Sequence, residues 1–371
     1  MPVTIDDETE GGQHSRPLRR GWTTGACAAA ATRAAYEALV TGICPDPVEI
    51  RLPSGTRTAF AIATFEAGES AATAGVIKDA GDDPDVTHGA LLKATVRAGL
   101  PGSGVVFRAG AGVGTVTRPG LSIPPGEPAI NPVPREMMRW AVDVVAERFG
   151  AARDVVVEIS IPGGEELAAK TLNGRLGIVG GLSILGTTGV VIPFSCSAWI
   201  HSIHRGIDVA RASGLEHIAG ATGSTSEAAV QRLYGLSEVA LIEMGDFVGG
   251  MLKYIRRHPV RRVTVAGGFA KITKLGQGLL DLHSRSGSVD RSWLAALLQN
   301  ADAPVDLITL AAQANTAQQI LQAAEACGIP LADRVAQAAW QTASTIVAGK
   351  KIACDVVIVD REGRVAGRFG P

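Results

Sequence analysis

Residues 216–235 read EHIAGATGSTSEAAVQRLYG, a pattern typical of a short buried strand that enters a Gly/Thr/Ser turn and then a helix. The same order returns in SEVALIEMGDFVGGMLKYIRRH (237–258) and in RRVTVAGGFAKITKLGQG (261–278). VDLITL with its helical sequel (305–328) suggests a fourth unit, and DVVIVD (355–360) predicts the strand that closes the chain. Strands that alternate with helices indicate a mostly parallel sheet covered on both faces.

In such sheets, ligands bind beyond the carboxyl ends of the strands. The three ends predicted here are ATGSTSE (221–227), EMGDF (243–247) and AGGFAK (266–271). Each combines glycine with a small hydroxyl, an acid or a lysine. We therefore expect a small molecule to bind at this edge.

The preceding half of the chain has a different order. VEIRLP (48–53), RTAFAIATFEA (57–67) and AATAGVIKD (71–79) read as three consecutive strands. DVTHGALLKATVRAG (85–99) is predicted to be a helix that Asp85 or Thr87 caps, and RDVVVEISIP (153–162) a further strand. This order predicts an α+β domain.

Between two of these segments lies KDAGDDPDVTHG (78–89), in which Asp79, Asp82, Asp83 and Asp85 surround one glycine and one proline. Pro84 cannot continue a helix, so this is a loop. An ordinary capped turn would explain it. The alternative is a site that gathers a cation or shapes a polar pocket.

Two other segments allow both a structural and a functional interpretation. Thr23 or Thr24 can cap the alanine-rich helix that starts in LRRGWTTGACAAAA, or the helix start can hold an anion. In GEPAINPVPR (126–135), Asn131 and Arg135 lie at the start of a predicted helix with Pro134 in its first turn. They either cap that loop, or Arg135 offers its fork to a substrate carboxylate.

Composition excludes several classes of protein. Lys plus Arg number 35 against 36 Asp plus Glu, and aromatic residues are 4% of the chain, which disfavours nucleic acid as a partner. The five cysteines never form a CxxC pair, so we expect reduced thiols and a cytoplasmic location. No signal peptide and no membrane span are predicted.

Known catalytic and metal-binding motifs are also missing. HExxH, GxSxG, GxGxxG and the phosphate loop GxxxxGK[ST] do not occur. Cys196, His201 and His204 could supply three metal ligands, but without a fourth we predict no metal site. The glycine-dense run NGRLGIVGGLSILGTTGVVIP (173–193) is weak evidence for a nucleotide by itself.

Five motifs together resemble the CbiD family of cobalt-precorrin-5B C1-methyltransferases of cobalamin biosynthesis. They are LRRGWTTGACAAAA (18–31), KDAGDDPDVTHG (78–89), GVGTVTRPGL (112–121), GEPAINPVPR (126–135) and GIVGGLSILGTTG (177–189). The resemblance covers nearly the whole chain after about residue 18. This chain has Ala111 where the family often has an acidic residue, so no role of that carboxylate carries over.

The resemblance implies methyl transfer from S-adenosylmethionine to C1 of a cobalt-containing, ring-contracted tetrapyrrole, which gives cobalt-precorrin-6A. It also implies an N-terminal α+β domain followed by a Rossmann-like α/β domain with a mostly parallel sheet. We place a disordered tail at residues 1–18, the first domain at 19–185 and the second at 186–371, with the boundary uncertain between 150 and 190. The chain would need no metal of its own and no membrane, and a homo-oligomer is left open.

With this activity as the premise, site residues can be assigned as expectations. For catalysis, either to relay a proton or to orient polar edges of the macrocycle, we predict Asp82, Asp83 and His88. For the methyl donor we predict Gly180, Gly181, Gly186, Thr187, Thr188, Gly189, Thr222, Gly223, Ser224, Glu243 and Asp246. For the substrate we predict Thr23, Thr24, Lys78, Asp85, Asn131, Arg135 and Lys271. The rival functions are a non-catalytic tetrapyrrole or nucleotide binding protein and, with less support, a sugar or nucleotide kinase.

Overall fold

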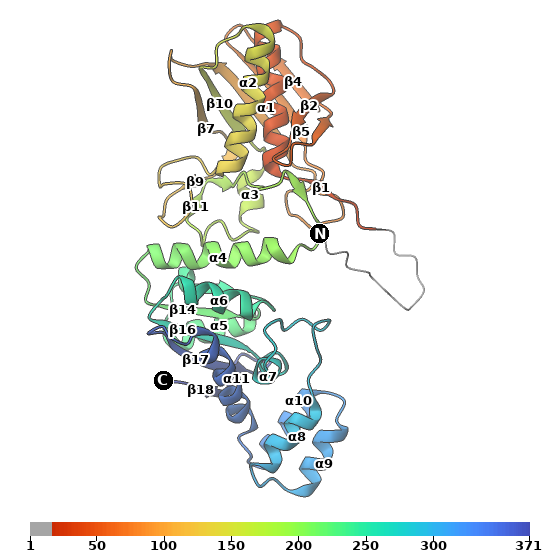
Figure 1. Cartoon of the computed structure of the whole chain (residues 1–371), viewed down its shortest axis with the longest axis vertical. Helices are drawn as coiled ribbons and strands as arrows, with labels where there is room; N and C mark the ends of the chain where they lie inside the picture. The colour runs from red at the N-terminus through yellow and green to blue at the C-terminus, as the bar shows by residue number, and fades with distance from the viewer. Residues whose placement is uncertain (1–16) are drawn as a thin grey trace. The chain divides into compact units, whose positions relative to one another are not determined.

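The computed structural model describes residues 17–371, so most of the predicted tail at 1–18 lies outside the described residues (Figure 1). The chain divides into two compact units, each assembled from three segments. The first unit contains the residues up to Gly110 together with Ile130–Pro162 and Ile184–Phe194. The second unit contains Ala111–Ala129, Gly163–Ser183 and Ser195–Pro371. The single domain boundary at residues 185 and 186 stays a prediction.

The first unit is built on a five-stranded sheet in the order β4-β5-β6-β10-β7, in which only β10 and β7 are parallel. Its strands are β4 (Thr64–Ala67), β5 (Ala71–Ile77), β6 (Leu91–Ala98), β7 (Val105–Ala109) and β10 (Val155–Ser160). Two small pairs accompany it, β2 (Val48–Arg51) with β3 (Arg57–Phe60), and β1 (Gly21–Trp22) with β13 (Val190–Val191). The predicted strand at 57–67 is therefore two strands, β3 and β4, in different sheets.

Two helices pack side by side in this unit, α1 (Thr24–Thr41) and α2 (Pro132–Phe149), and α1 also packs on β5 and β6 (Figure 1). Small side chains let α1 come close, because every alanine from Ala26 to Ala35 is fully buried. The side-chain oxygen of Thr23 accepts a hydrogen bond from the Ala26 N–H at 3.2 Å, which confirms Thr23 as the cap.

The helix predicted at 85–99 is wrong, because most of that segment is strand β6. Its buried residues Leu92, Ala94 and Val96 alternate with more exposed ones, which is the period of a strand. Antiparallel partners on both sides, β5 and β10, supply the backbone hydrogen bonds that a helix would otherwise have to make internally. The aspartate-rich segment thus joins two antiparallel strands rather than a strand and a helix.

The second unit contains a five-stranded sheet in the order β15-β14-β16-β17-β18. Its strands are β14 (His217–Ala221), β15 (Leu241–Glu243), β16 (Arg262–Gly268), β17 (Ala353–Val359) and β18 (Val365–Phe369). The first four run parallel, and β18, which follows the strand predicted to close the chain, runs antiparallel to β17. The mixed α/β class and the mostly parallel C-terminal sheet are confirmed.

Helices cover both faces of this sheet. The main core joins it to α4 (Cys196–Ala212), α6 (Val248–Arg257), α7 (Phe269–Gly276) and α11 (Leu331–Val347), whereas α5 (Ser224–Tyr234) packs with Ala219, Ala266 and Val357 on the other face. Further helices are α8 (Arg291–Gln299), α9 (Val305–Gln313) and α10 (Ala317–Ala326), with a 3₁₀ turn at Glu238–Ala240. None of the helices among residues 17–371 is long and apolar enough to cross a membrane.

The strand predicted at 305–310 is also wrong, because these residues form α9. Its buried residues Leu307 and Ala311 are four positions apart, as on one face of a helix. Short elements complete the second unit, namely β8 (Gly112–Val113) paired with β12 (Gly181–Leu182), β9 (Thr115–Val116) paired with β11 (Ile178–Val179), and helix α3 (Gly164–Ala168).

Candidate functional site

The aspartate loop, residues 78–89, closes at its base through two backbone hydrogen bonds. The N–H of Lys78 donates to the Ala90 carbonyl at 2.9 Å, and that of Gly89 donates to the Lys78 carbonyl at 2.8 Å. These bonds continue the pairing of β5 with β6. The loop therefore stands on a rigid base in the first unit, which is the usual support of a functional loop.

Inside the loop, a buried ion pair joins Lys78 and Asp85. The Lys78 side chain is 1% exposed, and its Nζ lies 2.7 Å from Oδ2 of Asp85. The other carboxylate oxygen accepts the N–H and hydroxyl of Thr87, at 2.8 and 2.6 Å. Burial by itself raises the pKa of Asp85, but the hydrogen bonds from Lys78 and Thr87 outweigh it and hold the pKa below its ordinary value.

Two further aspartates hold the segment that leads into α1. The guanidinium of Arg19 forks onto Asp79, and the Arg19 N–H donates to Oδ2 of Asp82 at 2.6 Å. The hydrogen bond from Arg19, helped by one from the Gly81 N–H, lowers the pKa of Asp79 to about 2. Asp79 is thus a carboxylate at neutral pH, and its pair with Arg19 is largely exposed.

Asp82 and His88 are exposed members of the loop, and Asp83 is half-buried. Asp83 uses Oδ1 to accept the N–H of Phe194 at 2.8 Å. His88 is exposed, and its Nδ1 accepts the Ala80 N–H at 3.1 Å, which places the proton of the neutral ring on Nε2. The three residues predicted for catalysis, Asp82, Asp83 and His88, therefore all lie in this one loop.

The predicted donor residues 186–189 lie beside the start of α1. Thr24 Oγ1 exchanges hydrogen bonds with the N–H and carbonyl of Leu185, at 2.9 and 3.2 Å, and the Thr23 N–H donates to the Gly189 carbonyl at 3.0 Å. A Cβ at Gly186 would collide with the Thr23 side chain, so glycine is required there. Thr187 and Thr188 are exposed, and Thr188 bonds to the backbone of Val190.

The N–H groups at the start of α1, which we considered for anion binding, make hydrogen bonds within the protein. The Gly25 N–H donates to Leu185, and the Ala26 and Cys27 N–H groups donate to Thr23. Asn131 donates its N–H to the Ile184 carbonyl at 2.9 Å. The side chain of Arg135 donates to the Ile130 carbonyl at 2.8 Å and lies over the Phe107 ring.

Gly180 and Gly181 belong to the second unit, whereas Gly186 and Gly189 belong to the first. Gly181 sits directly against the backbone of Gly112 in the β8–β12 pair, and its carbonyl accepts the side-chain N–H of Asn173 at 3.1 Å. The glycine-rich run is therefore divided between two units, and its role in binding the donor stays a prediction.

The carboxyl ends of the parallel strands bring the remaining predicted residues together in the second unit. Nζ of Lys271 on α7 lies 3.0 Å from Oδ1 of Asp246, as an ion pair without hydrogen-bond geometry, and donates to the Thr222 carbonyl at 3.4 Å. Gly223 precedes α5, Ser224 is exposed in its first turn, and Glu243 is exposed at the end of β15. Lys271 was assigned to the substrate but lies among the residues assigned to the donor.

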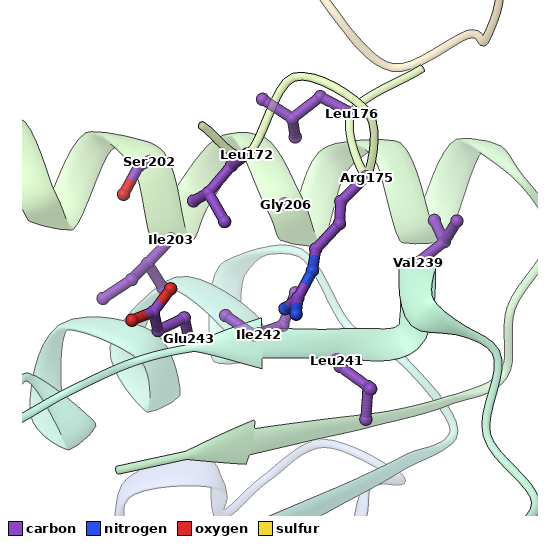
Figure 2. Close-up of a pocket in the computed structure, with 10 residues that line it drawn as sticks. All are labelled: Leu172, Arg175, Leu176, Ser202, Ile203, Gly206, Val239, Leu241, Ile242 and Glu243. Carbon is purple, nitrogen blue, oxygen red and sulfur yellow. The ribbon is translucent and has the colours of Figure 1, made fainter. Parts of the chain in front are cut away.

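Next to this edge, a hollow lies between α4, β15 and the loop at 172–176 (Figure 2). Arg175 extends from that loop towards β15. Its guanidinium donates two hydrogen bonds to the carboxylate of Glu227 on α5, at 2.8 and 2.6 Å. The bond to Glu227 raises the pKa of Arg175, and Glu243 adds to the effect. The lining residues are Leu172, Arg175, Leu176, Ser202, Ile203, Gly206, Val239, Leu241, Ile242 and Glu243.

Sequence reasoning missed the pair of Arg175 and Glu227. Both residues lie in stretches that we singled out, 173–193 and 221–227, but they are 52 positions apart and no local spacing connects them. No cluster of His, Cys, Asp and Glu suited to a metal ion occurs within residues 17–371. The His204 ring instead stacks on Tyr254 at a centroid distance of 3.8 Å.

The comparisons with known proteins agree with one another. The family model described as CbiD matches residues 12–193, and the one described as CbiD, C-terminal domain, matches residues 281–370. A protein of Bradyrhizobium sp. named cobalt-precorrin-5B C(1)-methyltransferase is 69% identical, across 95% of this chain and 94% of its own length. A protein of the same name from Agrobacterium fabrum is 61% identical, across 97% of this chain and 94% of its own length. Another from Paramagnetospirillum magneticum is 60% identical, across 94% of this chain and 98% of its own length.

A solved structure is also similar, that of a cobalamin biosynthesis protein (cbiD) from Archaeoglobus fulgidus. It is 28% identical, the match covers 68% of this chain and 77% of that one, and the TM-score is 0.39.

Proposed function

The chain belongs to the CbiD family, and on that premise we propose that it transfers a methyl group to C1 of cobalt-precorrin-5B in cobalamin biosynthesis. The observation that carries the proposal is the identity of 60–69% to proteins of that name over nearly their whole length. The resemblance of the five motifs is thereby confirmed as membership of the family. The substrate is a cobalt-containing tetrapyrrole, and the cobalt belongs to it rather than to the protein.

For the donor we propose S-adenosylmethionine, bound at the carboxyl edge of the sheet in the second unit, which we regard as Rossmann-like. Thr222, Gly223, Ser224, Glu243 and Asp246 would hold it. The chemistry of this edge fits a cationic nucleoside, because it offers exposed acid, a hydroxyl and backbone groups beside glycine. When bound, the donor supplies an electrophilic methyl on sulfur.

In this proposal, the protein works mainly by alignment. Displacement at the methyl carbon needs the ring carbon, methyl and sulfur in line, and correct placement can supply about 7–11 kcal/mol of the barrier in favourable cases. The carboxylates of Glu243 and Asp246 would orient the donor and offset its charge. The bond from Arg175 to Glu227 fixes the loop at 172–176 against the start of α5, so Arg175 acts as a positioning residue.

In the first unit, we propose that Asp83 and His88 face the macrocycle. His88 is exposed and Asp83 is half-buried, whereas Lys78 and Asp85 bind each other inside the loop. The role of Lys78 and Asp85 in substrate binding stays a prediction, as do those of Thr23, Thr24, Asn131 and Arg135. We also propose a cytoplasmic location, in keeping with the five unpaired cysteines, Cys27, Cys44, Cys196, Cys327 and Cys354.

The test uses the full chain, cobalt-precorrin-5B and S-adenosylmethionine with an isotopically labelled methyl group. Mass spectrometry should find one labelled methyl on the macrocycle. Glu243→Gln and Asp246→Asn should each raise KM for the donor about ten- to 100-fold, since a hydrogen bond to a charged group contributes about 1.5–3 kcal/mol. Glu216→Gln is the matched control, because this exposed acid stands just before the amino end of β14 and pairs with Arg261.

The result that contradicts the proposal is a folded chain that binds the tetrapyrrole but transfers no label. That outcome would favour a non-catalytic tetrapyrrole binding protein. Heat of binding with ATP but none with S-adenosylmethionine would instead favour a nucleotide binding protein or a kinase.

A further inference from the structure

Trp199 is an exposed aromatic residue at the carboxyl edge of the parallel sheet. It lies in the first turns of α4 and is 44% exposed. Large aromatic side chains at a ligand-binding edge combine a wide apolar face with little conformational freedom to lose on binding.

Contacts with the turn after β15 hold the ring in place. Its Nε1–H donates to the Glu243 carbonyl at 3.3 Å. A Cβ built at Gly245 would lie 3.4, 3.5 and 3.6 Å from Nε1, Cε2 and Cζ2 of the indole, so this edge of the ring rests on the turn. Gly245 has φ +55°, a conformation that favours glycine and lets the turn pass beside the ring. The exposed part of the indole is therefore fixed in position.

The residues on either side of the contact are the two acids assigned to the donor. Glu243 precedes the turn and has an exposed carboxylate, and Asp246 follows it and pairs with Lys271. A carboxylate at the end of a parallel strand is suited to the hydroxyl groups of a ribose. An aromatic ring that touches the same turn is then within reach of the base attached to that ribose.

We infer that Trp199 forms the stacking wall for the adenine ring of the methyl donor. This inference rests on the proposed function. Adenine is favoured over the sulfonium as the partner of the ring, because a planar base stacks on an aromatic face, and the turn that the indole touches carries the acids suited to the ribose next to that base. Stacking of this kind is worth about 1–3 kcal/mol per base, which corresponds to a change in Kd of about five- to 150-fold.

The experiment measures Kd by calorimetry for S-adenosylmethionine and for S-adenosylhomocysteine, which has the same adenine but no sulfonium charge. Trp199→Ala should weaken both ligands by the same factor, within about five- to 150-fold, and Trp199→Phe should bind more tightly than Trp199→Ala. Trp140→Phe is the matched control, because Trp140 is 37% exposed and lies on α2 in the first unit. Its Kd values should equal those of the wild type.

Tryptophan fluorescence gives a second readout that does not depend on the alanine variant folding. Donor binding should quench the emission of the wild type and of Trp140→Phe, and the quenching should disappear in Trp199→Phe while calorimetry still detects binding. If quenching persists in Trp199→Phe, the inference is overturned.

Three other outcomes separate the inference from the proposed function. If the wild type binds both ligands and Trp199→Ala, folded by circular dichroism, binds them equally tightly, Trp199 has no part in the site, whereas the proposed function survives. If only S-adenosylmethionine is weakened, the ring faces the sulfonium and the assignment to adenine is wrong. If the wild type binds neither ligand, the proposed donor fails and the inference fails with it.

Discussion

Replacing Asp85 by Asn tests whether the ion pair in the aspartate loop is a structural element. Lys78 Nζ is buried with the carboxylate 2.7 Å away, so the variant leaves an ammonium group inside the protein without its counter-charge. Loss of one partner of a buried pair typically costs about 3–5 kcal/mol. We expect a loss of about 3 kcal/mol in the free energy of unfolding, at the lower end, because the Asp85 side chain is 26% exposed and water screens part of the charge.

Lys78→Met is the informative counterpart, since it removes the buried charge itself. Asp85 then keeps the N–H and hydroxyl of Thr87 and partial contact with water. We expect this variant to lose only about 1 kcal/mol, and the double variant to resemble it rather than to show the sum of the two losses. Asp83→Asn is the control within the same loop and should change stability by less than about 0.5 kcal/mol.

Urea unfolding followed by circular dichroism gives the free energies, provided that the slope with denaturant is the same in all variants. The pKa of Asp85 is lower in the folded protein than its ordinary 3.8. The ionised carboxylate therefore stabilises the folded protein above about pH 3.8, and this stabilisation is lost as the pH falls through the folded pKa. The difference in the free energy of unfolding between the wild type and Asp85→Asn should therefore become smaller below about pH 4. A loss in Asp85→Asn no larger than that in Lys78→Met would refute the reasoning.

Three further predictions concern turnover, donor binding and pH. Asp83→Asn should lower kcat at least about tenfold without a loss of stability, and unchanged turnover in the methyl transfer assay would make the aspartate loop purely structural. Arg175→Lys keeps the charge but cannot donate two parallel hydrogen bonds to Glu227, so KM for the donor should rise about tenfold while thermal stability changes little. Equal KM values for the variant and the wild type would show that Arg175 has no part in the donor site. Burial, with Arg262 nearby, lowers the pKa of His217 below its ordinary 6.5, so the unfolded chain takes up a proton first and stability should fall as the pH drops below about 6.5. Denaturation at several pH values should show a flatter profile in His217→Gln, and an unchanged profile would contradict this assignment.

Local sequence patterns were sufficient to predict those features that depend only on residues close in the sequence. The cap by Thr23, the proline-led start of α2 and the alternation that builds β14, β15 and β16 could all be predicted, because capping, proline geometry and periodicity act within a few residues. Glu243 and Asp246 could be assigned to one edge for the same reason, since parallel strands end on the same side.

Tertiary structure decided what depends on distant partners. Residues 91–98 became strand β6 because β5 and β10 complete its hydrogen bonds on both sides, which outweighs a local pattern that also suits a helix. Lys271 reaches Asp246 only because α7 packs beside the turn after β15, and Arg175 meets Glu227 across 52 positions. The sequence by itself determined the family, the order of most elements and the place of Glu243 and Asp246 at one edge of the sheet. Only the packing of the chain decided which charges at that edge and in the aspartate loop are paired, because such pairs form between residues that no local pattern connects.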